Sequence, residues 1–270
     1  MTAVYESFFG FTKTPFSRDI ELEQLFELPG QKELMSRLIY VAERRLFGLI
    51  TGEVGSGKTT AIRALGKELP VTKYRLIYVA DSNLTPRNFY WAVLHQFGVT
   101  PHFYRGDAKR QLHKVILALY EDEKKIPVII IDEAHLLNRE MLEEIRFLTN
   151  FQMDSFSPMG LILVGQPELK KVLKLQVFEA IMQRVNIRFH LTGMDEGETK
   201  RYVIHCLKIC GVHNPVFTDE ALHIIYEFTQ GIPRKINNVC STCLLSAFSQ
   251  KKNLIDDHQV KVVLDNEFAT

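Results

Sequence analysis

The sequence has no long apolar run. No uninterrupted apolar stretch among the 270 residues approaches the about 20 needed to cross a bilayer. Runs such as Val128–Ile131 and Leu161–Val164 have only the length of buried strands. The first residues, Met1–Ser7, also lack the basic and apolar regions of a signal peptide. We therefore expect a soluble, cytoplasmic protein without membrane contact.

The chain also has almost no net charge. Lys and Arg number 33 and Asp and Glu number 32, which gives a formal net charge of +1. This balance excludes a domain that binds nucleic acid through a strongly basic composition. Any contact with nucleic acid must come from a local patch of basic residues, or from several subunits that combine their charges.

Cysteine is scarce, with four residues in two closely spaced pairs. Such pairs allow a zinc site. Each pair also falls in an amphipathic segment, where spacings of four and three residues mark one apolar helix face, and a free thiol packs there as a small apolar group. We favour packing and keep zinc as the minor alternative for Cys206, Cys210, Cys240 and Cys243.

The clearest pattern in the chain is a phosphate-binding loop. Its glycines let successive backbone N–H groups turn toward a phosphate, because no Cβ stands in the way. Lys58 would carry its charge to the β- and γ-phosphates, and Thr59 would place a hydroxyl on Mg²⁺. An apolar strand before the loop and a helix beginning at Lys58 supply the context that the motif needs. The residues expected to bind the nucleotide are Gly52, Glu53, Val54, Gly55, Ser56, Gly57, Lys58, Thr59 and Thr60.

Strand-like and helix-like segments alternate up to residue 192, and the pattern is purely helical beyond it. Five strands separated by helices predict an α/β fold, with a parallel sheet covered by helices on both faces. We expect a nucleotide-binding domain over residues 1–192 and a small all-helical lid domain over residues 193–270. The aromatic, irregular segment 1–30 is expected to pack across the core of the first domain. The expected strands are 46–51, 74–80, 127–132, 160–165 and 185–191.

Polar residues follow two of these strands. The apolar run before Asp132 would deliver its carboxylate to the sheet edge as a Mg²⁺ ligand. Glu133 could orient the attacking water, an effect worth ~10²–10⁴-fold in rate. Gln166 is a candidate for contacting the γ-phosphate or the water, although a plain turn before Pro167 explains it equally well. The motif Asp-Glu-Ala-His ending at His135 also occurs in one helicase class, but the second core of those helicases is missing, so we interpret His135 as a loop residue.

Three arginines are candidates for reaching a nucleotide. Arg184 and Arg188 flank the last expected strand, and an arginine supplied by a neighbouring subunit is worth ~10³–10⁵ in the rate of this kind of hydrolysis. Arg184 is favoured because it directly precedes the strand; the sequence does not decide between the two. Arg234 opens a helix of the lid domain behind Pro233 and is expected to reach back to the nucleotide.

The order of these motifs resembles that of the AAA+ ATPases and, within them, the general secretion pathway A-type family. Three stretches carry the likeness: Phe8–Phe11 with Thr14–Phe16, Leu163–Leu169, and Gly231–Asn237. The resemblance covers nearly the whole chain. It implies a P-loop AAA+ core, binding of ATP and Mg²⁺, hydrolysis to ADP and phosphate, and assembly into a homo-oligomeric ring or helix.

Two roles divide that family. Secretion members look like this core followed by a membrane span and a cell-wall-binding module, and neither is found in these residues. Stand-alone members resemble the helper ATPases of transposons and phage Mu, which bind DNA and direct a transposase or integrase to its target. We expect the second role. An ATPase of secretion or envelope assembly without DNA binding is the alternative, and a nucleotide-gated scaffold with negligible turnover is a third interpretation.

By the same resemblance, double-stranded DNA would be gripped by the loop Asn83–Asn88. Thr85 and Arg87 are the candidates there, with Lys109 and Arg110 next. A solvated loop explains each single residue about as well. Such phosphate contacts would be indifferent to base sequence.

Overall fold

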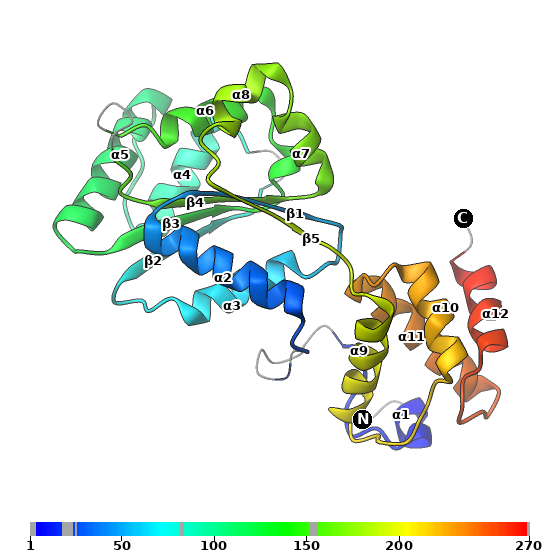
Figure 1. The fold of residues 1–270 in the computed structure, drawn as a ribbon. Coiled ribbons are helices and arrows are strands. Elements are labelled where there is room, and N and C mark those ends of the chain that lie inside the picture. Colours follow the sequence, from blue (N-terminus) through cyan, green and yellow to red (C-terminus); the bar gives the residue numbers. More distant parts are fainter. Residues whose placement is uncertain (1–3, 18–23, 25, 82–83, 152–155, 269–270) are drawn as a thin grey trace. The chain divides into compact units, whose positions relative to one another are not determined.

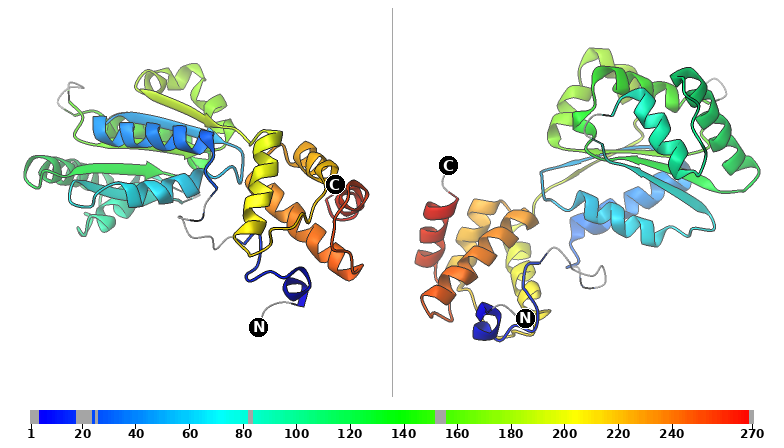
Figure 2. Two further views of the ribbon diagram at one scale, coloured as in Figure 1. Left: turned by 60° about the horizontal axis from the view of Figure 1, so that its bottom comes forward. Right: turned by 180° about the vertical axis from the view of Figure 1, so that it is seen from behind.

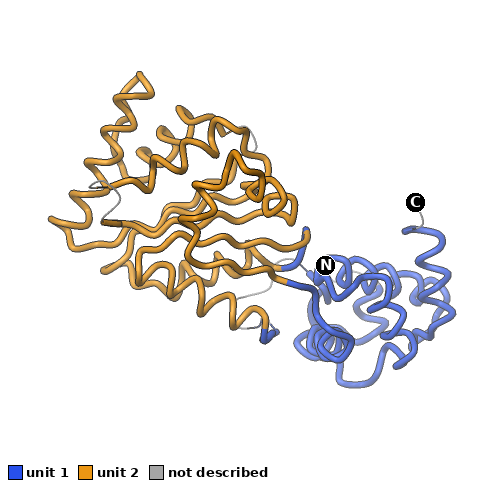
Figure 3. Tube along the Cα trace, turned by 45° about the horizontal axis from the view of Figure 1, so that its top comes forward, with its two compact units in different colours: residues 1–29, 54–56, 192–270 blue, residues 30–53, 57–191 orange. Residues whose placement is uncertain are grey.

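The computed structural model describes residues 4–17, 24, 26–81, 84–151 and 156–268. The chain divides into two compact units, drawn in different colours in Figure 3. The helical unit comprises residues 1–29, 54–56 and 192–270, and the sheet unit comprises residues 30–53 and 57–191. No helix in the described part of the chain is both long and apolar enough to span a membrane.

The sheet unit is built on five parallel strands in the order β2-β3-β4-β1-β5 (Figure 1). The three inner strands are buried along nearly their whole length, as continuous apolar runs require when helices cover both faces. The edge strands β2 and β5 alternate between buried and more exposed residues. The predicted parallel α/β fold is therefore confirmed. The strands are β1 Phe47–Gly52, β2 Tyr74–Val79, β3 Ile126–Ile131, β4 Gly160–Gly165 and β5 Ile187–Leu191.

Helices cover the two faces of this sheet, as Figures 1 and 2 show. Because successive side chains of a strand point to opposite faces, β3 contributes to two apolar cores. Val128 and Ile130 pack with α2 and α3, whereas Ile129 and Ile131 pack with the helices of the other face. The helices are α2 Pro29–Arg44 and α3 Lys58–Glu68 on one face, and α4 Pro86–Gln96, α5 Arg105–Glu121, α6 Arg139–Leu148, α7 Pro167–Leu173 and α8 Glu179–Met182 on the other.

The helical unit contains the four helices that the sequence predicts after residue 192. Thr218 and Asp256 accept hydrogen bonds from the amides of Ala221 and Gln259 and so begin two of them, as expected. The four cysteines lie buried in the apolar core between these helices, and burial raises the pKa of the Cys206 and Cys243 thiols to about 12. The helices of the unit are α1 Val4–Phe9, α9 Glu196–Lys208, α10 Asp219–Thr229, α11 Pro233–Ser249 and α12 Asp257–Glu267.

The N-terminal segment differs from the prediction. The sequence assigns it to the nucleotide-binding domain, but residues 1–29 belong to the helical unit. Phe11, Phe16 and Leu28 are buried among α9, α10 and α11, and the Thr12 amide donates to the Cys210 carbonyl at 2.8 Å. The physical reason is that these aromatic rings fill the core of a small unit, which four short helices alone enclose incompletely.

Candidate functional site

The phosphate-binding loop has the backbone that its glycines predict. It leaves β1 at Gly52 and enters α3 at Lys58. Gly55 and Gly57 have φ angles of +82° and +103°, a region that a residue with a Cβ avoids. The loop therefore requires glycine at both positions, and the predicted order of strand, loop and helix is confirmed.

The side chain of Lys58 lies within this loop. It is buried, and its ammonium donates to the carbonyl oxygens of Gly52 at 2.7 Å and of Glu53 at 2.9 Å. A buried ammonium needs oxygen partners to offset its lost hydration. The two carbonyls hold the charge at the start of the loop, where the sequence predicts phosphate binding.

Asp132 directly follows β3, and its buried carboxylate brings distant parts of the chain together. Its Oδ2 accepts from the Thr59 hydroxyl at 3.1 Å and from the Tyr78 hydroxyl at 2.8 Å. Its Oδ1 accepts from the amide of Glu133 at 2.8 Å. The predicted pair of Mg²⁺ ligands, Thr59 and Asp132, is thus in direct contact although 73 positions separate the two residues.

These residues fit a triphosphate with Mg²⁺. A hydroxyl and a carboxylate are the hard oxygen ligands that Mg²⁺ prefers. The Ser56 hydroxyl in the loop is buried and has no hydrogen-bond partner among the described residues. Leaving such a group unpaired costs about 1–3 kcal/mol, so a phosphate oxygen bound in the loop would stabilise it.

Tyr78 is a site residue that the sequence reading missed. Burial and the hydrogen bond to Asp132 raise the pKa of its hydroxyl, which keeps the group a proton donor. The side chain of Gln96 accepts from the Tyr78 amide at 3.1 Å and donates to the Tyr78 carbonyl at 2.8 Å, so it fixes the edge strand β2. Tyr78 approaches Asp132 because β2 pairs with β3 in parallel, an arrangement that the sequence alone does not specify.

Glu133 stands next to Asp132 in a left-handed backbone conformation, with φ of +50°. This conformation costs about 1–2 kcal/mol for a residue with a side chain. The hydrogen bond from the Glu133 amide to the Asp132 carboxylate offsets part of that cost. The Glu133 carboxylate is half exposed and lies 3.5 Å from Nδ1 of His135. An exposed carboxylate beside Asp132, the predicted Mg²⁺ ligand, suits the predicted role of orienting water.

Gln166 directly follows β4, the strand that lies between β1 and β3. It occupies the N-cap position of α7, but its side chain makes no capping bond. Because parallel strands end at one edge of the sheet, Gln166 lies between the phosphate-binding loop and Asp132. The topology therefore places its side chain at the edge where the γ-phosphate contact is predicted.

Arg184 and Arg188 lie at the other end of the sheet. Arg184 precedes β5, whose first residues pair with the beginning of β1. At about 3.3 Å per residue, the length of β1 separates it by roughly 15–20 Å from its own loop. Arg184 donates to the Arg146 carbonyl and, at 3.0 Å, to the Thr149 hydroxyl. Arg188 donates to the Met182 carbonyl at 2.8 Å. Arg184 thus lies about the length of β1 from its own loop, whereas Arg188 pairs with Leu49, three residues before Gly52.

Arg234 belongs to the helical unit, in the first turn of α11, directly after Pro233. The local part of its prediction, a helix opened by proline, is confirmed. Its approach to a nucleotide stays a prediction.

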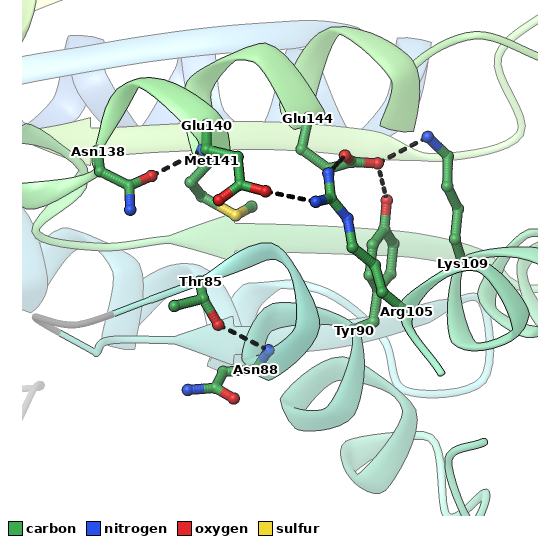
Figure 4. A network of polar contacts seen from close by, with 9 residues as sticks. All are labelled: Thr85, Asn88, Tyr90, Arg105, Lys109, Asn138, Glu140, Met141 and Glu144. Carbon is green, nitrogen blue, oxygen red and sulfur yellow. Dashed lines mark hydrogen bonds and ion pairs between the residues drawn. The ribbon is translucent and has the colours of Figure 1, made fainter. Parts of the chain in front are cut away.

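The four candidates for DNA contact differ in their surroundings. The Thr85 hydroxyl caps α4 by accepting from the Asn88 amide at 3.3 Å (Figure 4), and Asn83 lies outside the described residues. Arg87 is exposed and stacks on aromatic rings. Arg110 pairs with Asp107 and is largely exposed. Arg87 and Arg110 thus reach solvent.

Lys109 instead joins an ion network around the buried carboxylate of Glu144, which the sequence analysis does not predict. Its ammonium lies 2.6 Å from the carboxylate of Glu144, which also binds the Tyr90 hydroxyl and Arg105 (Figure 4). Burial opposes ionisation of Glu144, but hydrogen bonds from Lys109, Tyr90 and Arg105 outweigh it and lower its pKa to about 2. The network ties α4, α5 and α6 together. Its signal was a charged residue on the apolar face of α6.

Comparison with known proteins supports this assignment of elements. The family model "AAA domain" matches residues 41–173. General secretion pathway protein A of Aeromonas hydrophila is 32% identical over 260 residues, which are 93% of this chain and 46% of that protein. The chain thus spans about half the length of this curated relative.

Solved structures with a similar fold are more distant in sequence. Drosophila ORC bound to DNA has a TM-score of 0.67 at 16% identity, over 99% of this chain and 66% of that chain. Cdc6p from Pyrobaculum aerophilum has a TM-score of 0.68 at 13% identity, over 96% of this chain and 70% of that chain. The RuvB Holliday junction branch migration motor of Thermotoga maritima has a TM-score of 0.59 at 19% identity, over 93% of this chain and 72% of that chain. At these identities the likeness concerns the fold alone.

Proposed function

Because this chain belongs to the AAA+ family, we propose that it is a Mg-ATP-dependent ATPase that oligomerises on DNA and acts as a transposition helper for a partner transposase. The observation that carries the nucleotide part is the contact between the Thr59 hydroxyl and Asp132, beside the buried ammonium of Lys58. Three groups that the sequence predicts to act on one Mg-triphosphate lie at one edge of the sheet.

Each residue then has a separate task. Lys58 and the loop amides hold the β- and γ-phosphates, while Thr59 and Asp132 hold the metal. Bound Mg²⁺ would supply charge neutralisation on the phosphate oxygens. Glu133 orients the attacking water and accepts its proton, and Gln166 contacts the γ-phosphate or that water. Arg234 contributes a further charge from the helical unit.

Hydrolysis in this proposal needs a second subunit. Arg184 lies about the length of a strand from its own loop, so it acts on the nucleotide of a neighbour in a ring or helix. There it stabilises the charge that develops on the γ-phosphate. Arg188 is the other candidate for this role. Turnover per subunit should therefore depend on assembly.

The proposed DNA contact is made by side chains of α4 and α5. Arg87 and Arg110 are exposed cations, and Thr85 caps the helix that carries Arg87. Lys109 ranks last, since Glu144 already matches its charge. Among the proteins of similar fold, Drosophila ORC is bound to DNA in its structure, and RuvB of Thermotoga maritima is a Holliday junction branch migration motor. Proteins with this fold therefore include DNA-bound assemblies, which supports looking for double-stranded DNA as the partner.

A second candidate is a cytoplasmic ATPase of a secretion or envelope-assembly system without affinity for DNA. The observation in its favour is the 32% identity to general secretion pathway protein A. Both functions share the ATP site, and they differ in whether DNA is bound.

A gel-shift titration with random-sequence duplex DNA separates the two functions. The transposition-helper proposal expects binding that requires ATP and Mg²⁺ and weakens steeply with salt, because binding to phosphates releases counterions. Lys58→Ala is the matched control, since it should lose ATP-dependent binding while the chain stays folded. Absence of binding by wild-type protein that retains ATP would refute the DNA part and leave the secretion ATPase.

A further inference from the structure

An arginine at the start of α4 lies beside a group of aromatic residues, of which Phe103 and Tyr104 are exposed and Trp91 is partly buried. We call it the Arg87 cluster, and it consists of Arg87, Trp91, Phe103 and Tyr104. Arg87 and Trp91 lie one turn apart on α4, and Phe103 and Tyr104 directly precede α5. All four belong to the sheet unit.

The guanidinium of Arg87 contacts the faces of two rings. It is 5.0 Å from the ring centroid of Trp91 and 4.5 Å from that of Phe103. A guanidinium stacked through its faces keeps its N–H donors, which lie in its plane, available for a planar or tetrahedral anion. Within the described residues, no oxygen accepts a hydrogen bond from Arg87. By contrast, Arg105, Arg110 and Arg188 each bind a protein oxygen.

The two aromatic residues beside it are exposed and yet held in place. The side chains of Phe103 and Tyr104 are 64% and 71% exposed, and their rings meet edge to face at 5.3 Å. The loop before them is fixed, because the Trp91 indole donates to the His102 carbonyl at 3.1 Å and the His102 amide donates to Gln111 at 3.0 Å. Two ordered, exposed rings form a stacking surface that loses little entropy on binding.

The Arg87 guanidinium suits the phosphate of a nucleotide, and the neighbouring aromatic rings suit its base. Arg87 stands at the amino end of α4, where the helix dipole adds positive charge and favours a phosphate. Phe103 and Tyr104 offer ring faces and edges that a base can stack on only when it is not stacked in a duplex. A purely apolar protein partner would leave the Arg87 donors without acceptors, so nucleic acid is the better match.

We propose that the Arg87 cluster binds an unpaired stretch of DNA, with Arg87 on the phosphate and Phe103 and Tyr104 stacked on bases. This inference rests on the proposed DNA binding and adds to it a preference for single-stranded or distorted segments. Base stacking on an aromatic side chain is sequence-tolerant. The cluster therefore distinguishes the state of the strand and not its base sequence.

The test uses the full chain and its single tryptophan, Trp91, as a reporter beside the site. A thymidine homopolymer is added at fixed low salt with ATP and Mg²⁺, and Trp91 fluorescence is followed. We expect saturable quenching and an affinity for this strand that falls about tenfold in Tyr104→Ala and Phe103→Leu, within the range that stacking supplies. Phe103→Tyr keeps a ring and should bind like wild type. Arg87→Ala should weaken binding of single strands and duplex alike and make it less dependent on salt.

Tyr40→Ala is the matched control. Tyr40 is 46% exposed and carries Arg44 over its ring at 5.9 Å, so it is a similar pair elsewhere in the sheet unit. It should leave affinity unchanged. Thermal unfolding and ATP binding of each variant verify that the fold and the nucleotide site are intact.

The outcomes separate this inference from the proposed function. If wild-type protein binds neither duplex nor single strand, the proposed DNA function fails and the inference with it. If duplex is bound but Phe103→Leu and Tyr104→Ala bind single strands as wild type does, only the inference is refuted. Equal quenching by polyglutamate at the same charge concentration would likewise refute it and identify the cluster as a site for acidic polypeptides.

Discussion

Replacing Glu144 with Gln tests the ion network around this buried carboxylate quantitatively. Glu144 is only 4% exposed, and its carboxylate binds Tyr90, Arg105 and Lys109. Its pKa falls from the ordinary value of 4.5 to about 2 on folding. Because each unit of pKa shift corresponds to about 1.36 kcal/mol, this shift stabilises the folded state by about 3 kcal/mol at neutral pH. Glu144→Gln keeps the shape but removes the charge, so we expect it to lower the free energy of unfolding by about 2–4 kcal/mol.

The sign of the pH dependence follows from the lowered pKa. The unfolded chain binds a proton at Glu144 near pH 4.5, whereas the folded chain does so only near pH 2. The stabilisation is therefore fully present above about pH 5.5 and is lost as the pH falls toward 2.

Urea unfolding of wild type and Glu144→Gln at several pH values measures this effect. The difference between the two should be constant near neutrality and shrink steadily below about pH 5. Glu143→Gln is the matched control, because Glu143 forms an exposed pair with Arg139 one turn away and should cost less than about 0.5 kcal/mol. A Glu144→Gln effect as small as that of the control, or one independent of pH, would refute the reasoning.

Three further predictions concern the nucleotide site. Tyr78→Phe removes a 2.8 Å hydrogen bond to Asp132. Since such a bond contributes about 1 kcal/mol, the Mg²⁺ concentration for half-maximal nucleotide binding should rise roughly fivefold. Unchanged Mg²⁺ dependence in calorimetry would show that Tyr78 does not position Asp132. Glu133→Gln should slow phosphate release by ~10²–10⁴-fold while ATP still binds, and equal turnover would leave the scaffold interpretation in place. Arg184→Ala should abolish the rise of turnover per subunit with protein concentration. Mixing this variant with Glu133→Gln should restore part of the activity, because one subunit then supplies Glu133 and its neighbour supplies Arg184. Failure of the mixture to recover activity would argue against action across subunits.

The sequence reading succeeded where local physics decides the structure. The loop after β1 follows from Gly55 and Gly57, because its positive φ angles suit glycine and few other residues, and α10 begins where Thr218 can cap it. The buried strand before Asp132 follows from its apolar run. These signals lie within a few residues of the feature that they specify.

The misses are contacts between segments far apart in the chain. Tyr78 reaches Asp132 only because β2 pairs with β3, and Glu144 finds its partners on two other helices. Phe11 and Phe16 are buried in the core of the helical unit, and nothing in the sequence around them specifies that core rather than one of the two in the sheet unit. Such partners are fixed by packing of the whole chain, which periodicity and spacing do not contain.

Titration calorimetry of ATP into the folded protein, with and without Mg²⁺, tests the central claim most directly. The account predicts Mg²⁺-dependent binding by wild type. It also predicts that Lys58→Ala loses this binding, because the variant lacks the buried ammonium in the loop. Folded wild-type protein that takes up no adenine nucleotide in the presence of Mg²⁺ would contradict it.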